Sequence, residues 1–427
     1  MDAPVLLEEQ DIRILEVEGP TLVGHTCKVI RLESPGVDFD RLFESVGEKI
    51  LSVPELRWKL GGESGAPAWV HDDDFELDRH LVIYPAGAPL TEAELSAAAG
   101  GLFSEKLDRD RPLWRIDVVD TEDGGTALIW RIHHALADGT TAMRLAREVL
   151  WQETAAPAAT PAARAAAKQT DDARRHRHLV SLFEREFSRE PGPSPFDGKI
   201  GTERSVAFAT ISLSELHDAG KRAADATLND SVLSIVAGAI RHWMEIHHEQ
   251  HLGPVRCRVP VSMHHGDDDG GNRDSFFSVP LPLNEPDPIL RLQEIRAETD
   301  LRKQDHDAEE LDSLLRRISH TSPRLRHFYS KFEANPRRFA LNVSNVRGPS
   351  NPVSVLDAPV QTVHSIVEIG ERHALRVAAL SVGDRLCFGF CADPELVTDL
   401  DQMAEGIEWA ADRLIRAAAE EPEAGLG

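Results

Sequence analysis

The chain has 427 residues, of which 41% are hydrophobic and 28% charged, as is ordinary for a globular protein. Its formal net charge of −25 argues against a nucleic-acid partner, because phosphate binding needs a basic face. The apolar run 231–240 is about half the length that spans a bilayer. The N-terminus also lacks the basic-then-apolar order of a signal peptide, so a cytoplasmic location without a transmembrane segment is predicted.

The four cysteines stand at positions 27, 257, 387 and 391. None forms a Cys-x-x-Cys pair, so no zinc-ligand arrangement is predicted and no metal site is expected. We expect these cysteines to be reduced and mostly buried.

The first part of the chain predicts a strand followed by a helix. Residues 126–132 (TALIWRI) are rich in β-formers and follow a DGG turn. After Gly139, the apolar residues Ala142, Leu145 and Val149 recur at helical spacing. The segment 133–139 (HHALADG) therefore lies on a strand-to-helix turn, where side chains can face a cleft.

An alanine- and proline-rich connector at 154–172, followed by a short helix at 179–187, divides the chain. The predicted parts are an N-terminal lobe (1–152), a crossover (153–203) and a C-terminal lobe (204–427). In the last, Asn229 and Asp230 are predicted to cap a helix. Strands are expected at 255–263, 339–346, 375–380 and 386–390. This mixture predicts an α/β fold of two similar-sized halves.

His133 and His134 are the candidate functional residues. Acyl transfer from a thioester to a hydroxyl needs a base, and histidine suits this task because its ordinary pKa is roughly 6.5. Both rings on one metal ion are disfavoured, since adjacent residues of an extended segment point to opposite faces. Asp138 can lie near His134 after the turn, and Gly139 is expected to permit a tight backbone. Adjacent histidines alone are not specific, because the sequence has two more such pairs.

The whole pattern His-His-x-x-x-Asp-Gly resembles the signature of the CoA-dependent acyltransferase superfamily. That group includes chloramphenicol acetyltransferase, nonribosomal peptide condensation domains and bacterial wax ester synthase/diacylglycerol acyltransferases. Other segments resemble the last family in particular, and their order covers nearly the whole chain: 112–114 (PLW), 229–241, 271–273 (GNR) before 280–282 (PLP), 344–349 (SNVRGP) and 393–399.

The resemblance implies two chloramphenicol-acetyltransferase-like lobes, with mixed sheets flanked by helices and an active-site tunnel between the lobes. It implies acyl-CoA as co-substrate and no further cofactor. The second histidine of the family signature is the base, a role that falls on His134. The aspartate of the signature is structural, which predicts a buried carboxylate–guanidinium pair between Asp138 and Arg57.

Further residues are given roles by the same resemblance. Pro112 and Trp114 are expected to form a core wedge behind the turn rather than a substrate contact. Asn272 is either a polar contact at the reacting carbonyl or part of a structural turn. The remaining candidates for the tunnel wall or the cleft are Asn229, Asp230, Ser344 and Asn345.

The chain departs from the family pattern in several segments. The opening Asp-x-x-Phe-Leu element is 11–15 (DIRIL), the Ser-Tyr-x-Gly element is 381–384 (SVGD), and His364-Ser365 stands near the place of a Tyr-Pro pair. These changes leave the base intact and are expected to reshape a substrate pocket.

The leading hypothesis is esterification of diacylglycerol or a long-chain alcohol with a fatty acyl-CoA, giving triacylglycerol or wax ester. An alternative is an acyltransferase of specialised metabolism, with an alcohol or amine acceptor and a CoA or carrier-protein donor. A non-catalytic binding protein is a third hypothesis, against which the intact motif argues. Peripheral contact with a membrane or lipid droplet stays open.

Overall fold

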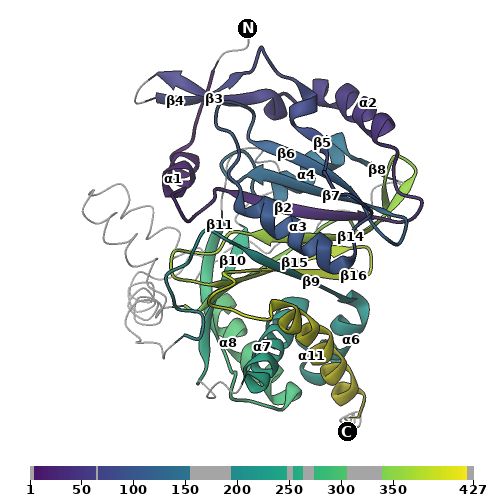
Figure 1. The fold of residues 1–427 in the computed structure, drawn as a ribbon. Coiled ribbons are helices and arrows are strands. Elements are labelled where there is room, and N and C mark those ends of the chain that lie inside the picture. The colour runs from purple at the N-terminus through teal and green to yellow at the C-terminus, as the bar shows by residue number, and fades with distance from the viewer. Residues whose placement is uncertain are drawn as a thin grey trace.

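A computed structural model describes residues 4–63, 66–153, 194–247, 253–262, 274–304 and 339–420. Figure 1 shows two lobes, each built around its own sheet, with helices on the sheet faces. The first sheet has seven strands and the second has six, and both mix parallel with antiparallel pairs. The predicted two-lobed α/β fold is confirmed.

The first sheet contains the strand that leads into the histidine run. In spatial order its strands are β5 (Leu81–Ile83), β6 (Trp114–Asp120), β7 (Thr126–His133), β2 (His25–Leu32), β14 (Ala358–Val367), β13 (Val353–Val355) and β8 (Trp151–Glu153). The strand predicted at 126–132 is therefore confirmed as β7. Strands β13 and β14 come from the distant C-terminal part of the chain, and β14 pairs antiparallel with β2. The first lobe is thus completed by residues far from it in sequence.

Helices cover both faces of the first sheet. Helix α2 (Phe39–Lys49) buries Leu42 and Val46, one helical turn apart, in one core together with residues of α4 (Gly139–Val149). Helix α3 (Glu92–Ser104) lies on the opposite face and begins with a capping box between Thr91 and Glu94. Three short 3-10 turns complete this lobe: Ile50–Ser52, Pro54–Arg57 and Leu77–Arg79.

A small third sheet with a helix packs against the histidine run. Its strands are β1 (Val5–Leu6), β4 (Ala66–His71) and β3 (Trp58–Glu63), and helix α1 (Glu9–Val17) follows β1. Trp69 of β4 and Leu7 share a small apolar core with Leu113 and Ala135. The N-terminal segment therefore covers part of the turn that carries His134.

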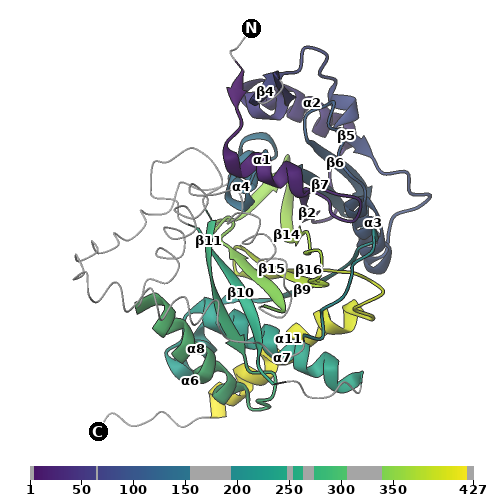
Figure 2. The same ribbon diagram turned by 90° about the vertical axis from the view of Figure 1, so that its left-hand side faces the viewer.

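The second sheet contains, in spatial order, β11 (Asp274–Leu281), β10 (Val255–Ser262), β12 (Leu341–Val346), β15 (Leu375–Val382), β16 (Arg385–Ala392) and β9 (Ser205–Ser212). The four strands predicted in this lobe are confirmed as β10, β12, β15 and β16. The helices α6 (Leu213–Ala224), α7 (Leu228–Ile246), α8 (Pro288–Gln304) and α11 (Leu400–Glu420) gather on the side of this sheet away from the first lobe (Figure 2). Contacts of β14 with β15 and β16 join the two sheets.

All four cysteines are free and buried, as predicted. The predicted connector and its short helix fall within 154–193, outside the described residues. None of the helices in the described part of the chain is both long enough and apolar enough to cross a membrane.

Candidate functional site

The turn between β7 and α4 carries the histidine run. His133 is the last residue of β7 and lies opposite His25 of β2. Its carbonyl accepts hydrogen bonds from the backbone N–H groups of Leu136 and Ala137, at 2.9 and 3.0 Å. The chain therefore turns sharply within 134–138 before α4 begins at Gly139.

His133 points into the protein and is 2% exposed. Its Nδ1 accepts a hydrogen bond from the backbone N–H of Ala135 at 3.1 Å. That bond leaves the proton on Nε2, which lies 3.4 Å from the Glu18 carboxylate, a contact too poorly directed for a good hydrogen bond. Arg109 also pairs with Glu18 at 2.5 Å. These contacts give His133 a structural position.

His134 turns the other way and keeps part of its surface exposed. Its backbone N–H donates to the carbonyl of Gly24 at 2.8 Å, which ties the residue to the start of β2. Burial, and after it the positive charge of Arg376, lower the pKa of the His134 side chain to about 4. The imidazole is therefore neutral at pH 7, as a proton acceptor must be.

Asp138 is the N-cap of α4. Its carboxylate accepts a hydrogen bond from the backbone N–H of Thr141 at 2.7 Å, and the residue is buried. Gly139 does not have the role expected of it. It is not among the glycines with positive φ, and an added Cβ would meet only Val346 Cγ2 at an ordinary 3.5 Å. The backbone of the turn therefore does not require glycine at position 139.

The predicted pair between Arg57 and Asp138 is wrong. Arg57 ends the 3-10 turn Pro54–Arg57, and its guanidinium carbon lies 6.0 Å from the centre of the Phe75 ring. The ion pairs among the described residues do not include Arg57 with Asp138. The neighbouring Glu55 instead pairs with Arg144 of α4 at 3.0 Å. Sequence position could not reveal this, because the 3-10 turn directs the two side chains to different neighbours.

Pro112 and Trp114 lie behind the turn. The indole Nε1 of Trp114 donates to the Leu56 carbonyl at 2.7 Å, and its ring stacks on His80 with centroids 4.8 Å apart. The intervening Leu113 carbonyl accepts the backbone N–H of His133 at 2.9 Å. The segment thus packs in the core and anchors the start of the turn, consistent with the expected wedge.

The second lobe faces the turn with β12 and β15. Val346 of β12 lies near Gly139, and Ser344 falls on the same face of this strand because side chains alternate. Asn345 falls on the opposite face of the strand, and both side chains are partly exposed. Arg376 of β15 completes the charged surroundings of His134.

Asp230 is a structural residue rather than a substrate contact. Thr227, not Asn229 or Asp230, is the N-cap of α7, and its N–H and hydroxyl both donate to Asp230 Oδ2, at 2.8 and 2.6 Å. Oδ1 accepts from the Thr299 hydroxyl at 2.6 Å. Asn229 is partly exposed beside it, and Asn272 lies outside the described residues.

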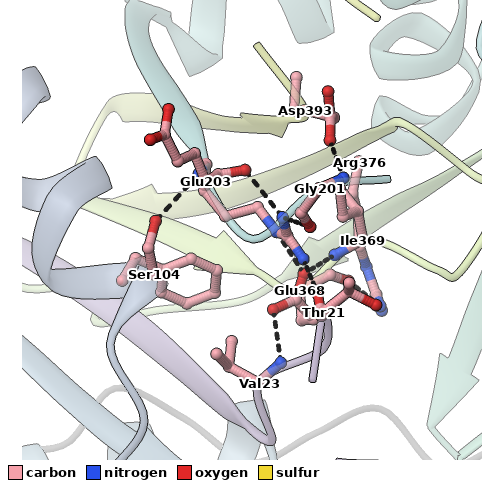
Figure 3. A network of polar contacts seen from close by, with 12 residues as sticks. Thr21, Val23, Ser104, Gly201, Glu203, Glu368, Ile369, Arg376 and Asp393 are labelled. Carbon is pink, nitrogen blue, oxygen red and sulfur yellow. Dashed lines mark hydrogen bonds and ion pairs between the residues drawn. The ribbon is translucent and has the colours of Figure 1, made fainter. Parts of the chain in front are cut away.

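A buried polar network joins the Gly24 segment to the second lobe (Figure 3). Arg204 pairs with Glu368 at 2.8 Å, and Glu368 accepts the backbone N–H of Val23 at 3.0 Å. Arg204 also donates to the Thr21 carbonyl. Residues from both lobes therefore hold the segment just before β2, whose Gly24 carbonyl accepts the hydrogen bond from His134.

Several of these residues carry no motif in the sequence. Gly24 is one, because a Cβ at this position would lie 2.1 Å from His133 Nε2. Glu18, Glu368 and Arg376 are ordinary charged residues until the chain is folded.

Among the described residues, no group of His, Cys, Asp and Glu side chains could hold a metal ion.

Comparison with known families gives two matches that together cover most of the chain. Residues 7–186 match the wax ester synthase/diacylglycerol acyltransferase catalytic domain, and residues 270–414 match the C-terminal domain of the same family. The first match contains the histidine run and the second contains β12, β14 and β15.

Relatives agree with these matches. Two Mycobacterium tuberculosis proteins are each named a probable diacylglycerol O-acyltransferase. The first is 25% identical over 90% of this chain and 89% of its own length. The second is 27% identical over 82% of this chain and 84% of its own length. The wax ester synthase/diacylglycerol acyltransferase of Marinobacter aquaeolei has the same fold, with a TM-score of 0.73 and 21% identity, covering 97% of this chain and all of that one. A starter condensation domain of rhizomide synthetase, solved with C8-CoA, aligns with a TM-score of 0.59 at 14% identity, over 99% of this chain and 96% of its own.

Proposed function

The chain belongs to the wax ester synthase/diacylglycerol acyltransferase family and is an acyl-CoA-dependent acyltransferase, and from this premise we propose that His134 is its general base. The observation that carries the proposal is the difference between the two adjacent rings. His133 is buried against Glu18, whereas His134 keeps part of its surface exposed. Of the two rings, we therefore assign the reacting one to His134.

The tautomer of His134 also supports this role. A hydrogen bond between its ring and its own backbone carbonyl contributes to its pKa. We propose that Nδ1 of His134 carries the proton and donates to this carbonyl, and that Nε2 is the nitrogen that accepts the proton of the acceptor hydroxyl.

The reaction follows from these positions. Nε2 takes the proton as the hydroxyl oxygen attacks the thioester carbonyl carbon, giving a tetrahedral intermediate with a negative oxygen. The carbon–sulfur bond then breaks, and the imidazolium returns its proton to the CoA thiolate. A base of this kind contributes about 10²- to 10⁴-fold to the rate. Ser344 and Asn272 are proposed as polar contacts near the reacting carbonyl.

The proposed acceptor is a lipid hydroxyl, on diacylglycerol or a long-chain alcohol, and the products are triacylglycerol or wax ester. The names of the mycobacterial relatives and of the Marinobacter enzyme support this class. Peripheral contact with a membrane or lipid droplet is part of the proposal. The exposed apolar side chains of Val5, Leu6 and Val17 around α1 support it.

The test measures thiol release from palmitoyl-CoA with hexadecanol or dioleoylglycerol as acceptor, and identifies the ester by mass spectrometry. His134→Ala is expected to lose at least about 10²-fold in kcat/KM. The matched control is His242→Ala, because His242 stacks on Trp409 of α11 in the other lobe. Full activity of His134→Ala would exclude this histidine as the base, and turnover with neither acceptor would exclude the proposed acceptors.

A further inference from the structure

Lys28 is a buried cation in the middle of the first sheet. It lies on β2 between Trp130 of β7 and Ser365 of β14, and only 2% of its surface is exposed. Its ammonium donates a hydrogen bond to the Ser365 hydroxyl. A neutral hydroxyl alone compensates poorly for the loss of hydration of an ammonium group, so such a position is costly without a nearby negative charge.

The face of the sheet on which Lys28 lies is the face of α4. Side chains alternate along β2, so Lys28 shares its face with Ile30 and Leu32, which belong to one core with Trp130 and with Ala142 of α4. The turn with His134 and Asp138 is at the N-terminus of this helix. Lys28 therefore lies on the side of the sheet where the candidate base is.

Charges from several elements surround this position. Burial lowers the pKa of Lys28 to about 8, Asp138 at the start of α4 raises it, and Arg376 of β15 lowers it. His134 is influenced by the same three groups, with Asp138 opposing the two cations. Asp11 of α1 also interacts electrostatically with Asp138. Cys27, the chain neighbour of Lys28, stays a neutral thiol because burial raises its pKa to about 12.

We propose that Lys28 is a positioning residue of the catalytic turn, whose ammonium, held by Ser365, supplies the positive charge facing Asp138 and His134. Lys28 acts through two effects: attraction to Asp138 holds the start of α4, and repulsion of a second positive charge lowers the pH at which His134 becomes protonated. The inference rests on the proposed function, because it requires His134 to be the base.

The test is the pH dependence of kcat/KM for palmitoyl-CoA and hexadecanol, from pH 4.5 to 9.5, in the full-length protein. Lys28→Met is expected to lower kcat/KM at pH 7 about 10-fold and to move the acid limb upward by roughly 0.5 to 1 pH unit. The wild-type protein is expected to lose activity above pH about 8 as Lys28 loses its proton. Lys28→Met should lack that alkaline step.

Two controls accompany this variant. Lys49→Met removes another partly buried lysine of the same lobe, on α2, and should keep the wild-type profile. Ser365→Ala removes only the hydroxyl partner of Lys28, so it should shift the acid limb in the same direction by a smaller amount. It keeps the proposal testable if Lys28→Met fails to fold.

The outcomes separate this inference from the proposed function. If His134→Ala is inactive while Lys28→Met and Ser365→Ala keep the wild-type pH profile, the role of Lys28 is wrong and His134 remains the base. If Lys28→Met loses thermal stability but the acid and alkaline limbs of its pH profile stay where they are in the wild type, Lys28 is structural and the inference is overturned. If Arg57→Ala produces the shift instead, the role belongs to Arg57. Activity retained by His134→Ala would overturn the proposed base itself.

Discussion

Glu368 accepts a hydrogen bond from the backbone N–H of Val23 at 3.0 Å, across 345 positions of sequence. The next residue, Gly24, accepts the backbone N–H of His134 at 2.8 Å. A carboxylate directly after β14, from the C-terminal part of the chain, therefore helps to place the candidate base. Arg204 completes this connection through its ion pair with Glu368.

Glu368→Ala is expected to destabilise the protein by about 3 to 5 kcal/mol, because it leaves the buried guanidinium of Arg204 without its carboxylate. The specific activity of the folded fraction should also fall, since the Val23–Gly24 segment loses its anchor. Urea unfolding and kcat measure the two effects. The exposed neighbour Glu371 provides the control, and Glu371→Ala should change stability by less than about 0.5 kcal/mol. Equal stabilities of the two variants would contradict the role of the pair.

Gly24→Ala is expected to reduce activity strongly, because the new Cβ would lie 2.1 Å from His133 Nε2. Either the His133 ring or the start of β2 must move, at a cost of about 1 to 3 kcal/mol. Gly101→Ala in α3 is the matched control, since a Cβ there meets nothing within 4 Å. That helical change should stabilise the protein by about 0.5 to 1 kcal/mol. Thermal unfolding and kcat/KM are measured for both variants. A fully active Gly24→Ala would show that the turn tolerates the displacement of His133 or of the start of β2.

Glu18→Gln is expected to make stability less dependent on acid pH. Burial favours the protonated acid, but the contacts with His133 and Arg109 outweigh it and lower the pKa of Glu18 from 4.5 to about 2. The folded-state pKa is depressed, so the carboxylate stabilises the protein fully above pH 4.5 and loses this contribution as the pH falls toward 2. The contribution is roughly 3 kcal/mol at pH 7.

The measurement is the difference in unfolding free energy between the wild type and Glu18→Gln. It should shrink by roughly 1 kcal/mol between pH 7 and pH 3.5. Glu92→Gln removes a carboxylate with an exposed side chain and should show a much smaller change. A difference for Glu18→Gln that stays constant over this range would show that its carboxylate is not held by the His133 and Arg109 contacts.

Asp230→Ala is expected to destabilise the protein by about 1 to 3 kcal/mol without changing KM for either substrate. The carboxylate closes the capping box of α7 and bonds Thr299, so its loss removes a cap and a buried hydrogen bond. Denaturant unfolding measures the change in stability, and steady-state kinetics measure KM. Asp218→Ala, on the exposed face of α6, is the matched control. A raised KM together with wild-type stability would show that Asp230 contacts a substrate.

The sequence predicted a large part of the fold. The strand at 126–132 and the helix after Gly139 follow from local patterns, since β-branched runs and helical spacing act over a few residues. The cap of α7 was placed two to three residues too late, because Asn229 and Asp230 resemble cap residues as strongly as Thr227 does. Only the backbone geometry decides which residue is the cap.

The histidine signature and the family were determined by the sequence itself, because a motif of fixed spacing sits on one turn and needs no long-range contact to be identified. The surroundings of the turn were decided by the tertiary structure. Glu18 and Lys28 come from one segment and Glu368 and Arg376 from another, far away in the sequence, and their charges matter only because folding removes them from water and places them together. The expected pair of Asp138 with Arg57 failed for the same reason, since the partner of a buried charge is set by packing rather than by order along the chain.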